Sequence, residues 1–143
     1  MTDKKQPIPC VASIVLNKNH SKTVFTLRLK EPEKGQWSTP GGKIDWGESH
    51  EEAAIREAHE ELGVKVKVLK LVGITNDYNK ELGWHYISLL YVCEFVGNEN
   101  EITNMEPHKH EKVEWFDVNN LPKNIGWKGK RAIDMYLKSI SAK

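Results

Sequence analysis

The stretch GGKIDWGESHEEAAIREAHEELGV, from Gly41 to Val64, holds seven carboxylates, although the whole chain has a formal net charge of only +1. Its Gly-Gly pair predicts a turn and forbids a helix at that point. A helix is predicted directly afterwards, because Ser49 and Glu52 match the S-x-x-E capping box. Gly63 can adopt the left-handed conformation that ends such a helix. The segment therefore predicts a loop, a helix and a second turn.

Three of the carboxylates share one side of the predicted helix. Glu57, Glu60 and Glu61 follow the i, i+3, i+4 spacing, which places them in one sector beside the apolar face. A hard divalent cation binds several carboxylate oxygens and would relieve the repulsion among them. A solvated acidic face is the alternative, but the adjacent Arg56 and the preceding Gly-Gly turn favour a site. The apolar face is predicted from Ala54, Ile55, Ala58 and Leu62.

The remainder of the chain predicts an α/β fold in one domain, residues 1–143, with residues 1–7 as a flexible tail. Strands are indicated by alternating or continuous apolar, β-branched runs. They mix with helices without strict alternation, which favours a mixed β-sheet sandwiched between α-helices. The predicted strands are residues 9–16, 23–30, 65–75, 84–97 and 113–118, and the predicted terminal helix begins at Trp127.

The composition excludes several classes of function. Near-zero net charge gives no support for nucleic-acid or membrane-surface binding. No segment approaches the ~20 apolar residues of a membrane span, and the N-terminus lacks an apolar signal core. A cytoplasmic protein is therefore expected. Cys10 and Cys93 lie far apart in apolar runs, so two buried free thiols are predicted, with a disulfide or a reactive thiol as the alternative.

The spacing of residues from Gly42 to Val64 adds a family resemblance. Read as G-x5-E-x7-R-E-U-x-E-E-x-G-U, where U is an aliphatic residue, every fixed position is present, and the small Ala58 occupies the first U position. The segment resembles the Nudix box, and the surrounding order of elements is similar to that family throughout. The resemblance implies the Nudix fold, a metal-binding loop-helix-loop, and hydrolysis of a nucleoside diphosphate linked to another moiety.

The resemblance also implies a metal site. In that family the carboxylates at the positions of Glu57, Glu60 and Glu61, with the main-chain carbonyl of Gly42, hold Mg²⁺, for which Mn²⁺ can substitute. The metal clamps a diphosphate and activates a water for attack on phosphorus.

Two further roles follow from the resemblance. Arg56 belongs to the catalytic set and is expected to pair with Glu48. The general base is either Glu57 or an acid from the loop before the last strand, which offers Glu106 and Glu111. Of these two, Glu111 is preferred as a further metal ligand, with a surface salt bridge as its alternative.

The substrate is indicated by the flanks of the box. Residues 37–49 and 104–122 are similar to MutT-like nucleoside triphosphate pyrophosphatases, which implies hydrolysis of a triphosphate to the monophosphate and pyrophosphate, with nucleotide-pool sanitation as a role. Another nucleoside diphosphate-X substrate, such as a nucleotide sugar, is the alternative, followed by a non-catalytic nucleotide-binding module. ADP-ribose pyrophosphatases of the family carry a proline beyond the box, which is missing here, as is the P-Q-G-G of its RNA pyrophosphohydrolases.

Three residues outside the box are predicted to bind the nucleotide. Arg28 matches a strand residue that reaches the phosphates in similar proteins, or else it is an exposed strand arginine. Trp127 would stack on the base or instead pack the terminal helix on the sheet. Asn124 would read a base edge or instead cap that helix. The histidines show no ligand spacing and are expected at the surface or in hydrogen bonds, and the chain is expected to be a monomer or a homodimer.

Overall fold

The computed structural model describes residues 5–141, so residues 1–4 of the predicted tail lie outside the described part. Residues 5–7 precede the first strand without regular structure. The strands are β1 (Ile8–Leu16), β2 (Lys22–Arg28), β3 (Trp37–Ser38), β4 (Gly41–Lys43), β5 (Lys65–Asn79), β6 (Trp84–Val96) and β7 (His110–Asp117), and the helices are α1 (His50–Leu62), the 3-10 helix η1 (Glu99–Glu101) and α2 (Trp127–Ser141).

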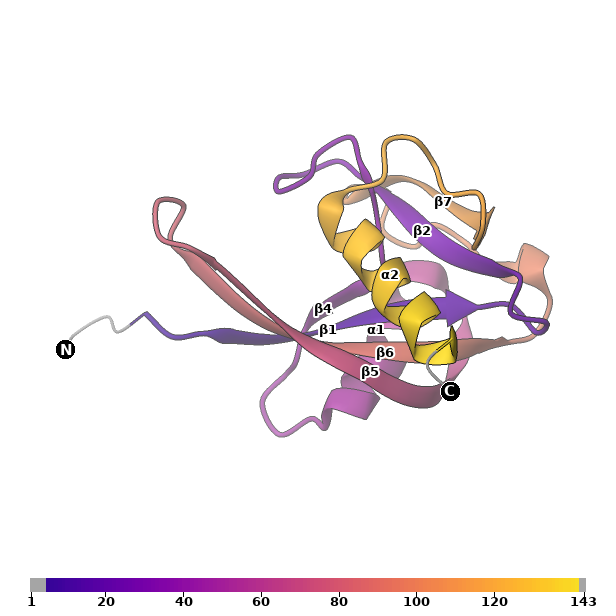
Figure 1. Ribbon diagram of the computed structural model, residues 1–143, viewed down its shortest axis with the longest axis horizontal. Helices are drawn as coiled ribbons and strands as arrows, with labels where there is room; N and C mark the ends of the chain where they lie inside the picture. Colours follow the sequence, from indigo (N-terminus) through magenta and orange to yellow (C-terminus); the bar gives the residue numbers. More distant parts are fainter. Residues whose placement is uncertain (1–4, 142–143) are drawn as a thin grey trace.

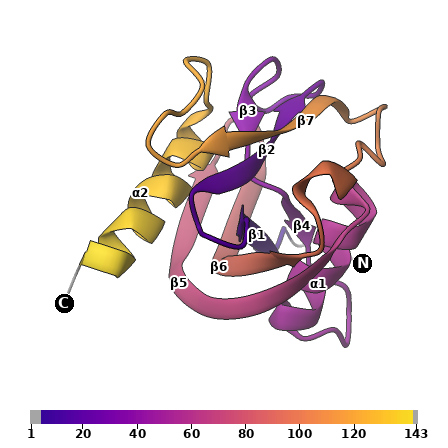
Figure 2. The same ribbon diagram turned by 90° about the vertical axis from the view of Figure 1, so that its right-hand side faces the viewer.

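These strands form one mixed seven-stranded sheet within residues 5–141. The strand order is β3-β2-β1-β6-β5, while β4 pairs with β1 and β7 pairs with β2. β1 runs parallel to β6 and antiparallel to β2. The helix α1 covers one face of the sheet and α2 the other (Figures 1 and 2). The predicted sandwich of a mixed sheet between helices is therefore confirmed.

The centre of the sheet is apolar on both faces because both are covered by helices. Along β1, Val11 and Val15 belong to the core on the α1 side, whereas Ile14 and Leu16 belong to the core on the α2 side. β6 alternates in the same way beside it, as its pairing register with β1 requires. The continuous apolar run of β1 is thus explained by burial on two sides.

The predicted ends of α1 are confirmed. The Ser49 side chain accepts a hydrogen bond from the amide of Glu52, and the Glu52 carboxylate accepts one from the amide of Ser49. Gly63 ends the helix with a φ of 69°, in the left-handed region that a glycine adopts without strain. This cap fixes where the helix stops and hence which way its last acidic residues point.

The buried face of α1 differs from the predicted one in three residues. Ile55 is 43% exposed, so its assignment to the apolar face was wrong. Ala53 and the carboxylate-bearing Glu61 are buried instead. The reason is that α1 packs on β1, β4 and β5 through a face centred on Ala54 and Glu61, which leaves Ile55 at the solvent edge.

The Gly-Gly segment, predicted as a turn, forms the short strand β4 beside β1. A side chain at Gly41 would collide with the main-chain oxygen of Val11, so only glycine allows this pairing. A Cβ on Gly42 would lie 2.5 Å from Oε1 of Glu57. The loop backbone and the α1 carboxylates are therefore in direct contact.

All five predicted strands differ by at least one residue from their predicted ranges, and the two largest changes affect the site. β5 continues to Asn79, and its hairpin with β6 projects beyond the rest of the sheet (Figure 1). β7 begins at His110, earlier than predicted, and pairs His110 with Arg28 of β2. Within residues 5–141, no helix has the length and apolar character needed to cross a membrane.

Candidate active site

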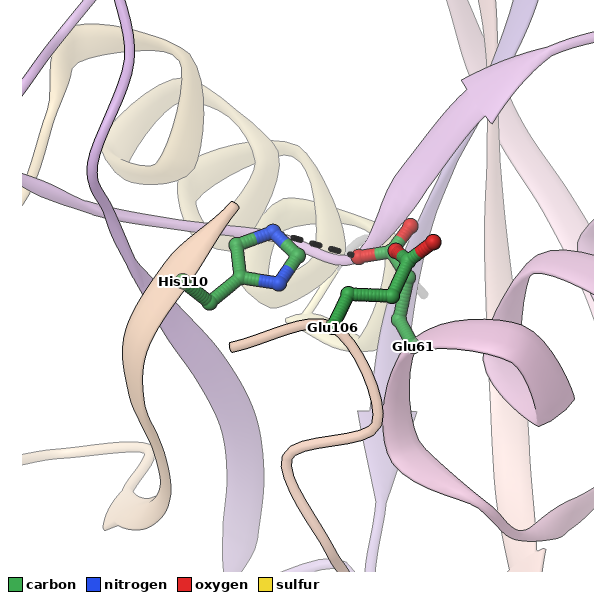
Figure 3. A group of neighbouring side chains, drawn as sticks. All are labelled: Glu61, Glu106 and His110. Carbon is green, nitrogen blue, oxygen red and sulfur yellow. Dashed lines mark ion pairs between the residues drawn. The ribbon is translucent and has the colours of Figure 1, made fainter. Parts of the chain in front are cut away.

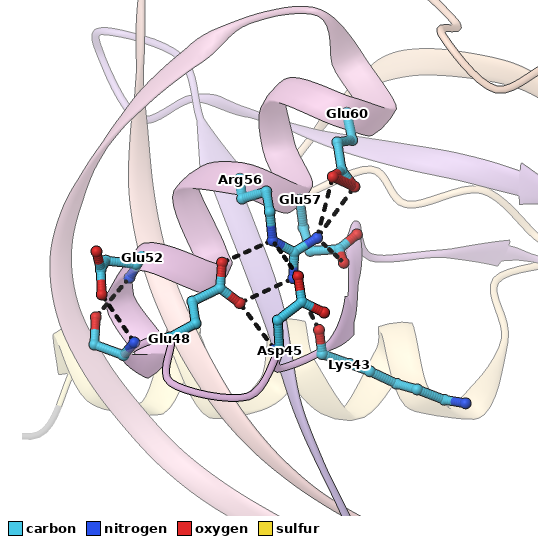
Figure 4. Close-up of polar contacts among 8 residues, drawn as sticks. Lys43, Asp45, Glu48, Glu52, Arg56, Glu57 and Glu60 are labelled. Carbon is cyan, nitrogen blue, oxygen red and sulfur yellow. Dashed lines mark hydrogen bonds and ion pairs between the residues drawn. The ribbon is translucent and has the colours of Figure 1, made fainter.

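Arg56 holds the loop and helix of the box together (Figure 4). Its Nε and Nη2 donate to the two carboxylate oxygens of Glu48 at 2.7 and 3.0 Å, which confirms the expected pair. Nη2 also donates to the main-chain oxygen of Lys43 at 3.0 Å, and Nη1 donates to Glu57 and Glu60 at 3.0 and 3.1 Å. The forked guanidinium therefore orients several carboxylates at once.

The charges of this network reinforce one another. Hydrogen bonds from Arg56 lower the pKa of the Glu48 carboxyl, helped by the amide of Asp45. The same bond with Glu48, followed by the contacts with Glu60 and Glu57, raises the pKa of Arg56. Glu48 and Arg56 are therefore both charged at neutral pH. The guanidinium is engaged with the protein, so we assign Arg56 a positioning role.

A second acidic group lies where α1 meets the loop before β7. The ligand atoms of Glu61, Glu106 and His110 all lie within 4.8 Å of one another. Figure 3 shows the two carboxyl groups side by side, with the imidazole ring of His110 facing Glu61. Oε1 of Glu61 accepts a hydrogen bond from the amide of Gly41 at 3.0 Å, which ties this group to the Gly-Gly loop.

The charges around Glu61, Glu106 and His110 favour the binding of a cation. Burial raises the pKa of Glu61 well above its usual range, with a smaller contribution from neighbouring Glu57. Nε2 of His110 is 3.7 Å from Glu61, but burial lowers the pKa of His110 to about 4, so the ring is neutral at pH 7. No Lys or Arg of residues 5–141 pairs with Glu61. A buried carboxylate in this position lacks a counter-charge.

The donor set fits a hard divalent cation. A cleft of about 510 Å³ is lined by Glu57, Glu61, Glu106 and His110 together with the Gly41–Lys43 backbone. Carboxylate and carbonyl oxygens are the ligands that Mg²⁺ prefers, and its remaining positions are completed by water and phosphate. The Nδ1 atom of His110 is buried without a partner within the described chain. The residues present therefore suit Mg²⁺ or Mn²⁺.

Two residues of the predicted metal set lie outside this cleft. Glu60 is bound to Arg56, with its side chain 46% exposed. Glu111 is exposed on β7, and the neighbouring His110 and Glu106 line the cleft instead. The geometry thus favours Glu106 over Glu111 as the acid that the loop contributes.

A second cavity, of about 260 Å³, adjoins the cleft between the sheet and the start of α2. The two spaces share Arg28 and the Gly41–Lys43 backbone in their walls. Asp77 and Arg131 line the second cavity and form a two-bond pair, with both distances 2.8 Å. Hydrogen bonds from Arg131 lower the pKa of Asp77. A molecule with a polyanionic part and a compact uncharged part would fill both spaces.

The three predicted nucleotide-binding residues have different positions. Arg28 lies where the two spaces meet, with Nε bonded to the main-chain oxygen of Pro32 at 2.7 Å. Trp127 is outside both cavities, and one face of its ring carries the guanidinium of Arg131 at 4.6 Å. Asn124 is exposed and donates to the main-chain oxygen of Gly35. Of these three residues, only Arg28 lines the site, whereas Asn124 anchors the loop that contains Gly35.

Four residues of the site were missed or given too little weight from sequence. His110 and Glu106 carry a weak signal, because both lie in the polar loop that precedes the strand predicted from residue 113. Asp77 shows only its place just beyond a predicted strand and Arg131 shows nothing, because the two are 54 residues apart and meet only when α2 packs over β5.

The chain is similar in sequence to known proteins over most of its length. The NUDIX domain model matches residues 7–136. An ADP-ribose pyrophosphatase of Methanocaldococcus jannaschii is 33% identical over 115 residues, which cover 80% of this chain and 66% of that protein. An uncharacterized Nudix hydrolase of Bacillus subtilis is 34% identical over 95 residues, which cover 66% of this chain and 60% of that protein. The chain thus spans under two thirds of the length of these curated relatives.

A solved structure agrees in fold. The MutT Nudix hydrolase of Burkholderia pseudomallei superposes with a TM-score of 0.81 at 28% identity, covering 91% of this chain and 98% of that one. The family match includes the box loop, α1 and the sheet that carries the acidic cleft. The chain therefore belongs to the Nudix family.

Proposed function

We propose that this protein is a metal-dependent pyrophosphohydrolase that converts a nucleoside triphosphate to the monophosphate and pyrophosphate. One observation carries the proposal. The buried Glu61 lies with Glu57 and Glu106 in a cleft that joins, through Arg28, a cavity of about 260 Å³. The cleft suits metal and phosphates, and the cavity suits the nucleoside.

The cleft is favourable for a chain of phosphates. Arg28, Lys30, Lys43 and Lys109 line it together with the carboxylates. Cationic side chains and a bound metal together complement the charge of a triphosphate. A nucleotide sugar carries only a diphosphate and would leave more of these cationic side chains without a phosphate partner. This supports the triphosphate as the preferred substrate.

The catalytic roles divide among the residues of the cleft. Glu57, Glu61 and Glu106 would hold Mg²⁺, which supplies charge neutralisation and a more acidic water when bound. Glu57 is our candidate to accept the proton of the attacking water, and Arg56 holds its Oε1 at 3.0 Å. Arg28 and Lys43 bind the phosphates, and the second cavity holds the nucleoside in position. Glu60 remains a predicted metal ligand, and to bind the metal its carboxylate would leave Arg56.

Other family substrates form the alternative. The archaeal relative is named an ADP-ribose pyrophosphatase, and ADP-ribose offers a diphosphate between two bulky groups. The same cleft and cavity could hold such a nucleoside diphosphate-X compound. A non-catalytic nucleotide-binding module is disfavoured, because the carboxylates of the box are all present.

A substrate panel tests the proposal. Purified protein with Mg²⁺ is assayed against normal and oxidised nucleoside triphosphates, ADP-ribose and nucleotide sugars, with the products separated chromatographically. We expect triphosphates to give monophosphate and pyrophosphate with the highest kcat/KM. Faster cleavage of ADP-ribose or a nucleotide sugar would replace the proposed substrate, and no cleavage of any compound would contradict the activity.

The loop acid can be identified by a matched pair of substitutions. We expect Glu106→Gln to raise the Mn²⁺ concentration needed for half-maximal activity by about tenfold or more, the scale for losing one partner of a metal site. Glu111→Gln should change it less than about twofold, because Glu111 is exposed and outside the cleft. Metal titration of activity measures both variants. The opposite ranking would restore Glu111 as the ligand and contradict the geometric assignment.

A further inference from the structure

The loop between β2 and β3, residues 29–36, is fastened to the start of α2. Oε1 of Glu33 accepts a hydrogen bond from the amide of Lys128 at 3.1 Å, although the residues are 95 positions apart. The first turn of α2 contains no acidic residue of its own. The first amides of a helix lack partners inside the helix and favour a negative charge. Glu33 therefore caps α2 from another part of the chain.

A second observation shows that the chain leaves room for this contact. A Cβ on Gly126, the residue before α2, would lie 2.5 Å from Oε1 of Glu33 and 2.7 Å from its carboxyl carbon. An alanine at this position would push the carboxylate of Glu33 away from its place beside the helix. Glu33 itself has a φ of 63°, which is uncommon for a residue with a side chain and is kept when surrounding contacts determine it.

The fastened loop holds Arg28 in place at the junction of cleft and cavity. Arg28 accepts a bond from the amide of Gly35 and donates its own amide to Gln36. Its Nε donates to the main-chain oxygen of Pro32 at 2.7 Å, and Pro32 also lines the cavity. The loop thus folds around Arg28. The bond between Glu33 and α2, together with that from Asn124 to Gly35, sets where the loop lies.

We propose that Glu33 is a positioning residue for the nucleotide, which acts by fastening residues 29–36 to α2 so that Arg28 and Pro32 face the substrate. This inference rests on the proposed function. When the contact is lost, the loop samples other positions, and the protein is competent to bind only for the fraction of time that the loop is in place. The apparent affinity falls by that fraction. Chemistry in the acidic cleft proceeds as before once the nucleotide is bound.

Three variants and one control test the proposal. Glu33→Ala removes the carboxylate, and Gly126→Ala displaces it while leaving it in the chain. Glu33→Gln keeps an oxygen acceptor and is the conservative variant. The control is Lys34→Ala, which lies in the same loop with an exposed side chain. Kinetic constants for the best triphosphate and hydrogen exchange of residues 29–36 are measured for each.

We expect Glu33→Ala and Gly126→Ala to raise KM about fivefold or more, with kcat changed less than about twofold, the pattern of lost ground-state binding. Exchange in residues 29–36 should accelerate in the same two variants. Glu33→Gln should recover most of both properties, and Lys34→Ala should match the wild type.

Each other result decides against the proposal. Unchanged exchange in both variants would mean that the loop does not depend on Glu33. Faster exchange with unchanged KM would mean that the loop does not position Arg28. A fall in kcat with unchanged KM in both variants would mean that Glu33 affects the chemical step instead of binding. If the wild type cleaves no nucleotide, the proposed function fails. Hydrogen exchange of residues 29–36 and the Kd of each variant for magnesium pyrophosphate then still test whether Glu33 holds the loop against α2.

Discussion

Replacing Glu61 by Gln is expected to lower kcat/KM by about a hundredfold to a thousandfold, the scale for removing an electrostatic partner of the transition state. The amide has nearly the shape of the carboxylate and can still accept the hydrogen bond from the Gly41 amide. It cannot supply the charge that the metal requires. Steady-state kinetics with saturating Mg²⁺ measure the change.

The same substitution should affect stability in the opposite direction. Burial raises the pKa of Glu61 in the folded protein, so the folded state binds this proton more tightly than the unfolded state. Stability of the metal-free wild type is therefore lost as pH rises from the unfolded pKa through the folded one. An amide carries no such charge. Thermal unfolding in EDTA should show a Tm for Glu61→Gln a few degrees above the wild type at pH 8, with a smaller difference at pH 5.

Metal should reverse that ranking. Because a ligand that binds only the folded state raises Tm, Mg²⁺ should stabilise the wild type more than Glu61→Gln. The control is Glu51→Gln, an exposed acid on the same helix with no contact to the cleft. Near wild-type kcat/KM for Glu61→Gln would remove Glu61 from the site, and equal Mg²⁺ stabilisation of both proteins would remove it from the metal.

The second large effect is expected on stability, from Arg56→Ala. Arg56 is 26% exposed and is the shared cation of Glu48, Glu57 and Glu60. Without it, Glu48, whose side chain is 14% exposed, remains as an unpaired charge. Removing one partner of a fully buried ion pair costs about 3–5 kcal/mol, and we expect a smaller but measurable loss for this partly exposed network. Urea unfolding of the metal-free protein measures the loss.

Two companion variants separate charge from shape. Arg56→Lys keeps the cation but loses the fork that reaches Glu48 and the Lys43 carbonyl, so it should fall between Arg56→Ala and the wild type. The double variant Arg56→Ala with Glu48→Gln should be more stable than Arg56→Ala alone, because the stranded charge is gone. An unchanged urea midpoint for Arg56→Ala would show that the network adds nothing to folding.

Prediction and structure agree best where a feature depends on residues that are close together in the sequence. Ser49, Glu52 and Gly63 cap α1 as predicted, because capping depends on residues only a few positions apart. The contact between Glu48 and Arg56 also spans a single loop and helix. Ile55 was misplaced because the helix period gives the order of residues around the axis but not the direction that faces the sheet.

Agreement was poorer where a loop feeds a strand. The predicted strand began at residue 113, whereas β7 begins at His110, and this change decides which side chains turn inward. Arg28 pairs with His110 and Leu27 pairs with Lys112, so Glu111 is the extra residue of a β-bulge and stays exposed while His110 is buried. Glu106, in the preceding loop, then reaches Glu61. A loop has no period from which this could be computed.

By itself, the sequence determined the local frame of the site: a Gly-Gly loop, a capped helix and acids on one side of that helix, all set by short-range spacing and sterics. Only the tertiary structure decided which acid joins Glu61, where Arg28 lies, and how Glu33 meets Lys128 across 95 positions. The physical reason is that these contacts depend on strand register and on the packing of α2 over the sheet. Both minimise buried unsatisfied groups over the whole chain, a condition that no short stretch of sequence contains.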